Sequence, residues 1–166
     1  MRRGSCARRG RPDEDAVSVG IELCTEIPAP PAQVWAVVSA IHTHTRWMAD
    51  AERITFVGTQ MQGVGTEFDC LTVIGPLRTT DRMRVTEWEP EVAMGIEHRG
   101  AVSGRGRFTL APTPGGTRFC WHEVLAFPWW MGGAVGERTA KPVFERVWRA
   151  NLARLRSIVI GDLSDR

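Results

Sequence analysis

The sequence lacks several features that mark particular classes of protein. It contains no tyrosine, and no apolar run approaches the ~20 residues that a membrane-spanning helix needs, so we expect no insertion into a membrane. His42 and His44 stand two residues apart, a spacing that does not share one face of a helix. No histidine or cysteine has the spacing of a zinc finger. We therefore predict no metal site, and no motif indicates a cofactor.

The four cysteines are few and widely spaced. They form no C-x-x-C motif, and Cys24, Cys70 and Cys120 each lie in an apolar or strand-like stretch. We expect them to be reduced core thiols of a cytoplasmic protein. A structural disulfide is the alternative.

No excess of one charge remains once the N-terminal segment is set aside. Residues 2–15 hold five of the 21 basic and three of the 19 acidic side chains, so the rest of the chain is balanced. A balanced domain has no overall field that attracts nucleic acid, and we expect no nucleic-acid partner. We expect residues 1–16 to be a disordered, arginine-rich tail and residues 162–166 a short C-terminal tail.

The apolar residues follow two periodicities, one typical of helices and one typical of strands. A first strand is predicted over residues 17–27, and a helix begins after Pro30 and Pro31, with a short second helix or turn over residues 42–49. Period-two alternation then predicts six strands, over residues 53–57, 66–74, 77–88, 92–98, 103–111 and 117–127. A last helix is expected to start near Pro142 and to end at a Gly161 cap. This order predicts a single α+β domain over residues 17–161.

The strand alternation also predicts which face of the sheet is covered. The expected inner set is apolar and comprises Met83, Val85, Val92, Met94, Ile96, Phe108, Leu110, Phe119, Trp121, Leu125 and Phe127. The opposite parity carries charged side chains that we expect to face water, namely Arg82, Arg84, Arg105, Arg107, Arg118 and His122. One face of a curved antiparallel sheet is therefore expected to wrap around the last helix.

Several short motifs resemble the helix-grip superfamily, the START-like or SRPBCC group that includes polyketide cyclase/dehydrase-like proteins. They are I-P-A-P-P-A-Q-V-W (27–35), G-V-G-T-E-F (63–68), R-V-T-E-W-E-P (84–90), G-G-T-R-F-C-W (115–121) and the L-x-x-L of the last helix (152–155). Each motif alone is weak, but their order matches the family over residues 17–160. The resemblance implies a seven-stranded sheet wrapped around a long C-terminal helix, with a ligand cavity between them.

One fold hosts many activities, so the resemblance leaves three functional hypotheses. The first is a carrier or sensor that binds a small hydrophobic molecule such as a lipid, polyketide or isoprenoid, as a monomer or weak homodimer. The second is a polyketide aromatase/cyclase or dehydratase. The third is a module that uses its outer-face arginines to contact RNA, the ribosome or another protein.

Three ionisable residues share the parity of the apolar face and are the catalytic candidates. They are Asp81, His98 and Glu123, residue types that can remove a proton beside a ketone and assist loss of water. The alternative is that Asp81 and His98 lie in water near strand ends while Glu123 pairs with an arginine. Our hypothesis for Glu123 is that it points into the cavity, without a full salt bridge, and anchors the polar group of a ligand.

Aromatic and methionine side chains are the expected ligand contacts. Trp47, Trp129, Trp130 and Met131 lie in irregular segments, where we expect them to form the mouth of the cavity or to plug it. The complete predicted ligand-binding set is Trp47, Met48, Met83, Met94, Phe108, Trp121, Glu123, Phe127, Trp130, Met131, Phe144 and Trp148.

Overall fold

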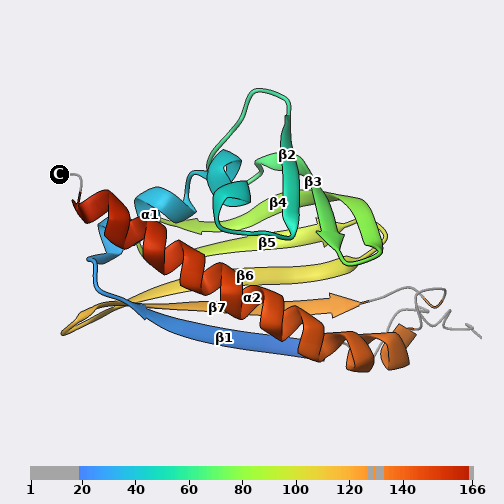
Figure 1. The fold of residues 1–166 in the computed structure, drawn as a ribbon. Helices are drawn as coiled ribbons and strands as arrows, with labels where there is room; N and C mark the ends of the chain where they lie inside the picture. Colours follow the sequence, from blue (N-terminus) through green and yellow to red (C-terminus); the bar gives the residue numbers. More distant parts are fainter. Residues whose placement is uncertain (1–18, 127–128, 130–132, 165–166) are drawn as a thin grey trace, which may run out of the picture.

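Seven antiparallel strands form one sheet that curves around a long helix (Figure 1). The computed structural model describes residues 19–126, 129 and 133–164. The strands are β1 (Val19–Ile27), β2 (Ala51–Val57), β3 (Glu67–Ile74), β4 (Leu77–Glu89), β5 (Ala93–Arg99), β6 (Ser103–Thr113) and β7 (Gly116–Ala126). Their order in the sheet is β1-β7-β6-β5-β4-β3-β2. This is the α+β helix-grip architecture expected from the sequence.

Three helical segments accompany the sheet among the elements that the structure describes. They are the α-helix α1 (Pro31–Val38), the 3-10 helix η1 (Ile41–Arg46) and the α-helix α2 (Gly133–Ser164). The first two fill the long connection from β1 to β2, and α2 lies across the sheet on the side of β1 and β7 (Figure 1). Among the described residues no helix is both long enough and apolar enough to span a bilayer.

Period-two alternation sorted the two faces of the sheet correctly in most strands. On the inner face Val85, Met94, Phe108, Phe119 and Trp121 are buried, whereas the outer parity carries exposed or half-exposed basic side chains. Val92 is an exception, because it is 50% exposed in the turn before β5. The preceding Glu91 has a positive φ of 65°, and this left-handed turn residue moves Val92 out of step with the strand.

The last helix is longer than its sequence signals indicated. It begins at Gly133 rather than near Pro142, and it continues through Gly161 to Ser164. Proline removes one backbone hydrogen bond inside a helix, but Pro142 lies on the exposed side, together with Arg138 one turn earlier. Water can therefore reach the carbonyl that the proline leaves without a donor. Gly161 is also exposed, where a helical glycine costs only about 1 kcal/mol.

The cysteine expectation was wrong for two of the three residues in the domain. Cys24 in β1 and Cys120 in β7 stand directly opposite each other and form a disulfide. Both lie on the outer face of the sheet, because their strand neighbours Leu23 and Trp121 point inward. Disulfides are rare in reducing compartments, so the cysteines no longer support a cytoplasmic location. Cys70 is a buried free thiol, as expected.

Candidate functional site

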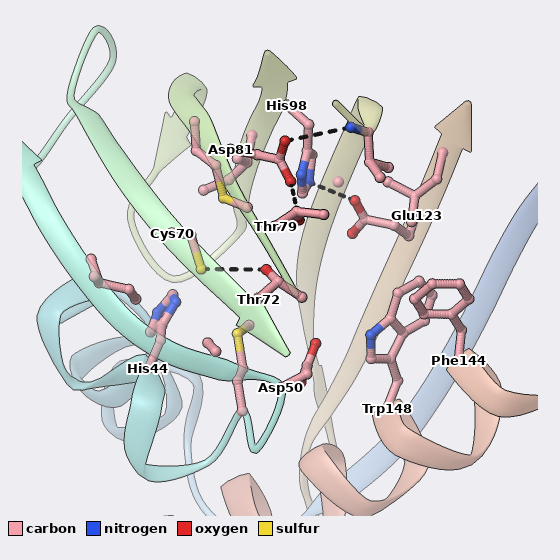
Figure 2. A pocket seen from close by; sticks show the side chains of 18 of the residues that line it. His44, Asp50, Cys70, Thr72, Thr79, Asp81, His98, Glu123, Phe144 and Trp148 are labelled. Atoms are coloured by element: carbon pink, nitrogen blue, oxygen red, sulfur yellow. Dashed lines mark hydrogen bonds and ion pairs between the residues drawn. The ribbon is translucent and has the colours of Figure 1, made fainter. Parts of the chain in front are cut away.

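A cavity of about 110 Å³ lies between the inner face of the sheet, η1 and α2 (Figure 2). Most of its wall is apolar, but it also contains a group of ionisable side chains. The predicted residues that line it are Met48, Asp81, Met83, Met94, His98, Phe108, Trp121, Glu123, Phe144 and Trp148. Other lining residues include His44, Asp50, Cys70, Thr72 and Thr79, which sequence reasoning missed as site residues.

The register of three neighbouring strands brings the polar group together. Glu123 of β7 is paired with Gly106 of β6, which is paired with Ile96 of β5. His98 lies two residues beyond Ile96 on the same face. A β-carbon at position 106 would come within 2.5 Å of the Glu123 carboxylate, so the glycine provides the space that this side chain occupies. The carboxylate can therefore reach across β6 to His98.

Glu123 is buried, with only 4% of its surface exposed, yet it has two polar neighbours. The indole N–H of Trp121 donates a 2.6 Å hydrogen bond to Oε2 of Glu123. Nε2 of His98 lies 2.7 Å from the other oxygen, Oε1. This second contact is short but poorly aligned, and Oε1 has no well-directed donor within the described part of the chain. Glu123 thus keeps an acceptor available at the cavity.

Both expectations for the partner of Glu123 were incorrect. It is neither without an ion pair nor paired with an arginine, because its partner is His98. The outer-face arginines point away from the cavity, and several of their guanidinium groups bind carboxylates on that same face, as Arg107 does with Glu87. Two of the three catalytic candidates therefore contact each other directly.

Nearby negative charge favours the protonated form of His98. Burial lowers the pKa of His98, but its polar contact with Glu123 and the charges of Glu123 and Asp81 outweigh burial and leave that pKa raised. The side chain is only 17% exposed, so it does not lie in water at a strand end. His98 and Glu123 form a positioned acid–base pair on the wall of the cavity.

Asp81 is the third candidate and lies in the middle of β4, where it is buried rather than hydrated. The hydroxyl of Thr79 donates a 2.7 Å hydrogen bond to Oδ2 of Asp81, and the backbone N–H of Val102 donates a longer one, 3.4 Å, to Oδ1. A β-carbon at Gly100 would overlap Asp81, so glycine is needed there. Figure 2 shows Asp81, Thr79, His98 and Glu123 gathered in one part of the cavity.

His44 is a second buried histidine of the cavity, placed by η1. Its Nε2 lies 2.7 Å from the carbonyl oxygen of Val38. A carbonyl only accepts hydrogen bonds, so Nε2 carries the proton and donates it. Burial lowers the pKa of His44 to about 4 despite this hydrogen bond. His44 is therefore a neutral imidazole at physiological pH.

Cys70 and Asp50 complete the polar wall. Burial raises the pKa of the Cys70 thiol to about 11, so it is protonated and a poor nucleophile. Asp50 precedes β2 and accepts a 2.6 Å hydrogen bond from the side-chain amide of Asn151 in α2. Asn151 is fully buried and also accepts a hydrogen bond from the backbone N–H of Ala49. Asn151 therefore links α2 to the residues that precede β2, beside the cavity.

The helix side of the cavity is aromatic. Trp148 of α2 stacks on Trp121 with ring centres 5.0 Å apart and an interplanar angle of 27°. Phe144, one helical turn earlier, packs on Trp148 at 5.4 Å. Such a surface suits a flat apolar group. The side chains of Phe144 and Trp148 project from α2 toward the sheet (Figure 2).

Of the predicted ligand contacts not yet placed, Trp47 alone lies among the described residues, and it does not line the cavity. Trp47 is fully buried instead of forming a mouth, and its ring packs against His44, Phe108 and Trp121 within the core. The end of η1 turns it inward, which no periodicity signals. The other three, Phe127, Trp130 and Met131, lie outside the described residues. Trp129, between them, is largely exposed.

Two local signals could have identified some of the missed polar residues. Thr79 shares the parity of Asp81 in β4, and Thr72 shares the parity of Cys70 in β3. His44 and Asp50 have no such signal, because they belong to η1 and to a connection. In the described part of the chain, no group of three His, Cys, Asp or Glu residues is arranged to hold a metal ion.

Comparison with known proteins extends the structural description. The family described as polyketide cyclase / dehydrase and lipid transport matches residues 18–159. No curated protein matches the sequence significantly. The crystal structure of TTHA0849 from Thermus thermophilus is similar, with 18% identity, a TM-score of 0.70, and coverage of 87% of this chain and 98% of that one.

Two similar structures come from aromatase/cyclases. The Zhui aromatase/cyclase of Streptomyces sp. R1128 has 14% identity and a TM-score of 0.71, covering 86% of this chain and 93% of that one. The di-domain ARO/CYC StfQ of the steffimycin biosynthetic pathway has 11% identity and a TM-score of 0.73, covering 89% of this chain and 52% of that one. At these identities the likeness establishes the fold alone. The family match over residues 18–159 goes further: this chain belongs to the polyketide cyclase / dehydrase and lipid transport family.

Proposed function

We propose that the protein binds one small, mainly apolar molecule in the cavity between sheet and helix, as a carrier or sensor. The observation that carries this proposal is the combination of an aromatic wall with a buried polar cluster in one cavity. Trp148 and Phe144 supply the flat apolar surface, and Glu123 supplies a buried acceptor with unused capacity. Binding sites for small molecules usually combine such apolar walls with a few placed polar groups.

The volume of the cavity limits the size of the ligand. Sites for drug-sized molecules are roughly 300–1,000 Å³, whereas a dry cavity of about 150 Å³ is enough to hold benzene. A cavity of about 110 Å³ is somewhat smaller than that, so a single ring with a short substituent needs a small outward movement of the surrounding side chains. A longer polyketide or lipid needs a much larger one. We expect the smallest aromatic ligands to bind with the least rearrangement.

Titration with toluene tests this proposal directly. We expect saturable binding at one site, seen as shifts of methyl and indole NMR signals of cavity residues and as a change in tryptophan emission. Trp148→Ala removes one face of the site and should weaken binding about tenfold, which corresponds to the ~1.4 kcal/mol of one stacked aromatic contact.

The matched control is Trp88→Ala, which truncates a tryptophan that packs on Trp35 away from the cavity. Its affinity for toluene should equal that of the wild type. Toluene shifts that are linear and unsaturable, or equal losses in the two variants, would contradict the binding proposal.

A second candidate function is acid–base catalysis of the cyclase or dehydratase type. The specific observation in its favour is the 2.7 Å contact between His98 and Glu123 inside the cavity, since one can remove a proton while the other stabilises the charge that results. Its test is deuterium exchange from D₂O into the carbon next to the carbonyl of a small aryl ketone. Glu123→Gln and His98→Gln should abolish exchange, and Glu97→Gln, on the outer face, should retain it.

The third hypothesis, a surface for RNA or an acidic partner, has little structural support. It requires arginines whose charge is available on the outer face. Arg78, Arg82, Arg99 and Arg107 each form an ion pair with a carboxylate at 3.0 Å or less. Their charge is therefore largely compensated within the domain.

A further inference from the structure

The cavity wall has an uneven balance of charge. Three carboxyl groups face it, from Asp50 before β2, Asp81 in β4 and Glu123 in β7. Its described lining contains no lysine or arginine. The arginines of the sheet strands belong to the opposite parity and to the outer face. An anion that enters the cavity therefore meets carboxylates without a compensating arginine or lysine.

The histidines do not reverse this balance. Negative charge favours a cationic His98, but Glu123 already contacts this side chain at 2.7 Å, and Asp81 adds further negative charge. The pKa of His44, lowered by burial to about 4, makes that side chain a neutral imidazole. Its N–H is directed to the Val38 carbonyl rather than to the cavity. A carboxylate ligand must therefore displace Glu123 from His98 to gain a cationic partner.

Hydrogen-bond donors beside the carboxyl groups are also in use. Trp121 donates to Glu123, Thr79 to Asp81 and Asn151 to Asp50. The indole N–H of Trp148, on the helix side, is neutral and cannot offset a negative charge. In contrast, Oε1 of the buried Glu123 has no aligned donor from the described residues, and this side chain faces the cavity (Figure 2). The polar end of the cavity can accept hydrogen bonds more readily than it can donate them.

We infer that the natural ligand carries a hydrogen-bond donor without negative charge, a hydroxyl or an ammonium group, which points toward Glu123 and Asp81. The cavity then excludes carboxylates and phosphates, including fatty acids. This inference rests on the proposed binding function and names the class of ligand for that same site. The physical reason is that placing an anion beside buried carboxylates adds like-charge repulsion to the cost of desolvation.

Four ligands of nearly equal size test the inference: toluene, benzyl alcohol, benzylamine and benzoate. We expect benzyl alcohol and benzylamine to bind more tightly than toluene at pH 7, and benzoate to bind at least about tenfold more weakly than benzyl alcohol. Benzoate binding as tight as that of benzyl alcohol overturns the inference, as does toluene binding more tightly than both donors. Failure of all four ligands, toluene included, instead contradicts the proposed binding function.

Charge-removing variants locate the effect. In Glu123→Gln and in Asp81→Asn the preference for benzyl alcohol over benzoate should shrink several-fold, because each removes one carboxylate from the wall. Glu97→Gln makes the same chemical change on the outer face, where Glu97 binds Arg99, and should leave the preference unchanged. An unchanged preference in both cavity variants, with native NMR spectra, overturns the inference. If either variant does not fold, the four-ligand series on the wild-type protein still decides it.

Discussion

The two histidines of the cavity show how the same side chain acquires opposite acid–base properties in one site. His44 faces a neutral backbone carbonyl, and burial lowers its pKa to about 4. His98 is also desolvated, but it contacts Glu123 and lies near Asp81, and its pKa is raised. Burial is common to both, so the difference comes from the charge of the partner. The protonated form of a desolvated histidine is favoured here where a carboxylate accompanies it.

The largest effect should follow from removing the cation of that pair. His98→Ala leaves the buried Glu123 carboxylate with the Trp121 hydrogen bond alone, and we expect a loss of about 3–5 kcal/mol in the free energy of unfolding at pH 7. Urea denaturation measures the loss. Adding Glu123→Gln to His98→Ala should recover part of it, because the uncompensated charge is gone. A loss below about 1 kcal/mol, or strict additivity of the two substitutions, contradicts a coupled pair.

An effect of similar or slightly smaller size is expected at His44 and has the opposite dependence on pH. Its folded pKa is depressed, so the unfolded chain binds a proton first as the pH falls from 6.5 toward about 4. Stability should therefore decrease over this window, by about 3 kcal/mol from this residue. In His44→Gln the amide can still donate to the Val38 carbonyl, and this contribution should disappear.

The measurement is urea denaturation of the wild type and of His44→Gln at about pH 7 and about pH 4.5, which spans most of the range over which His44 should titrate. Protonation of carboxylates with lowered pKa values, such as Asp69 beside Arg82, also lowers the stability of the protein in acid. These carboxylates are the same in the wild type and in the variant. The difference between the two pH dependences isolates His44. Parallel curves for wild type and variant would show that His44 is not neutral in the folded protein.

A smaller effect is expected when the carboxylate is removed and the histidine is kept. Glu123→Gln should cost about 1–2 kcal/mol at pH 6, because His98 can release its proton near neutral pH and then leaves no charge without a partner. In the wild type the raised pKa of His98 gives stability that is complete below pH 6.5 and is lost as the pH rises through its folded value.

Glu123→Gln should lack this decrease in stability at higher pH. NMR titration of His98 in Glu123→Gln should show a pKa below the ordinary value of 6.5, since burial then outweighs the remaining charge of Asp81. The matched control, Glu97→Gln, should leave the His98 titration as in the wild type. A His98 pKa that stays raised in Glu123→Gln shows that Glu123 is not the group that raises it.

Much of the fold could be predicted from local patterns. Alternation located all seven strands to within about two residues, and it placed Glu123 beside Trp121 and Leu125 on the inner face. The turn residues between strands indicated antiparallel neighbours. The ends of α2 were predicted poorly. Proline and glycine usually mark the ends of a helix, but the exposed Pro142 and Gly161 lie within this one. The sequence left Trp47 open between a mouth and a plug of the cavity, because no periodicity can be read at the end of η1; its burial in the core agrees with the second alternative.

The sequence by itself determined the strands, their inner face and the presence of Asp81, His98 and Glu123 on it, because parity depends only on neighbours along one strand. Only the tertiary structure decided that His98 meets Glu123, since this contact requires the register of β5, β6 and β7 and a glycine at position 106 between them. The Cys24–Cys120 disulfide, across a sequence separation of 96 residues, has the same origin. Register depends on turn geometry and on the pairing of whole strands as well as on the inner-face pattern, so parity along one strand does not contain it.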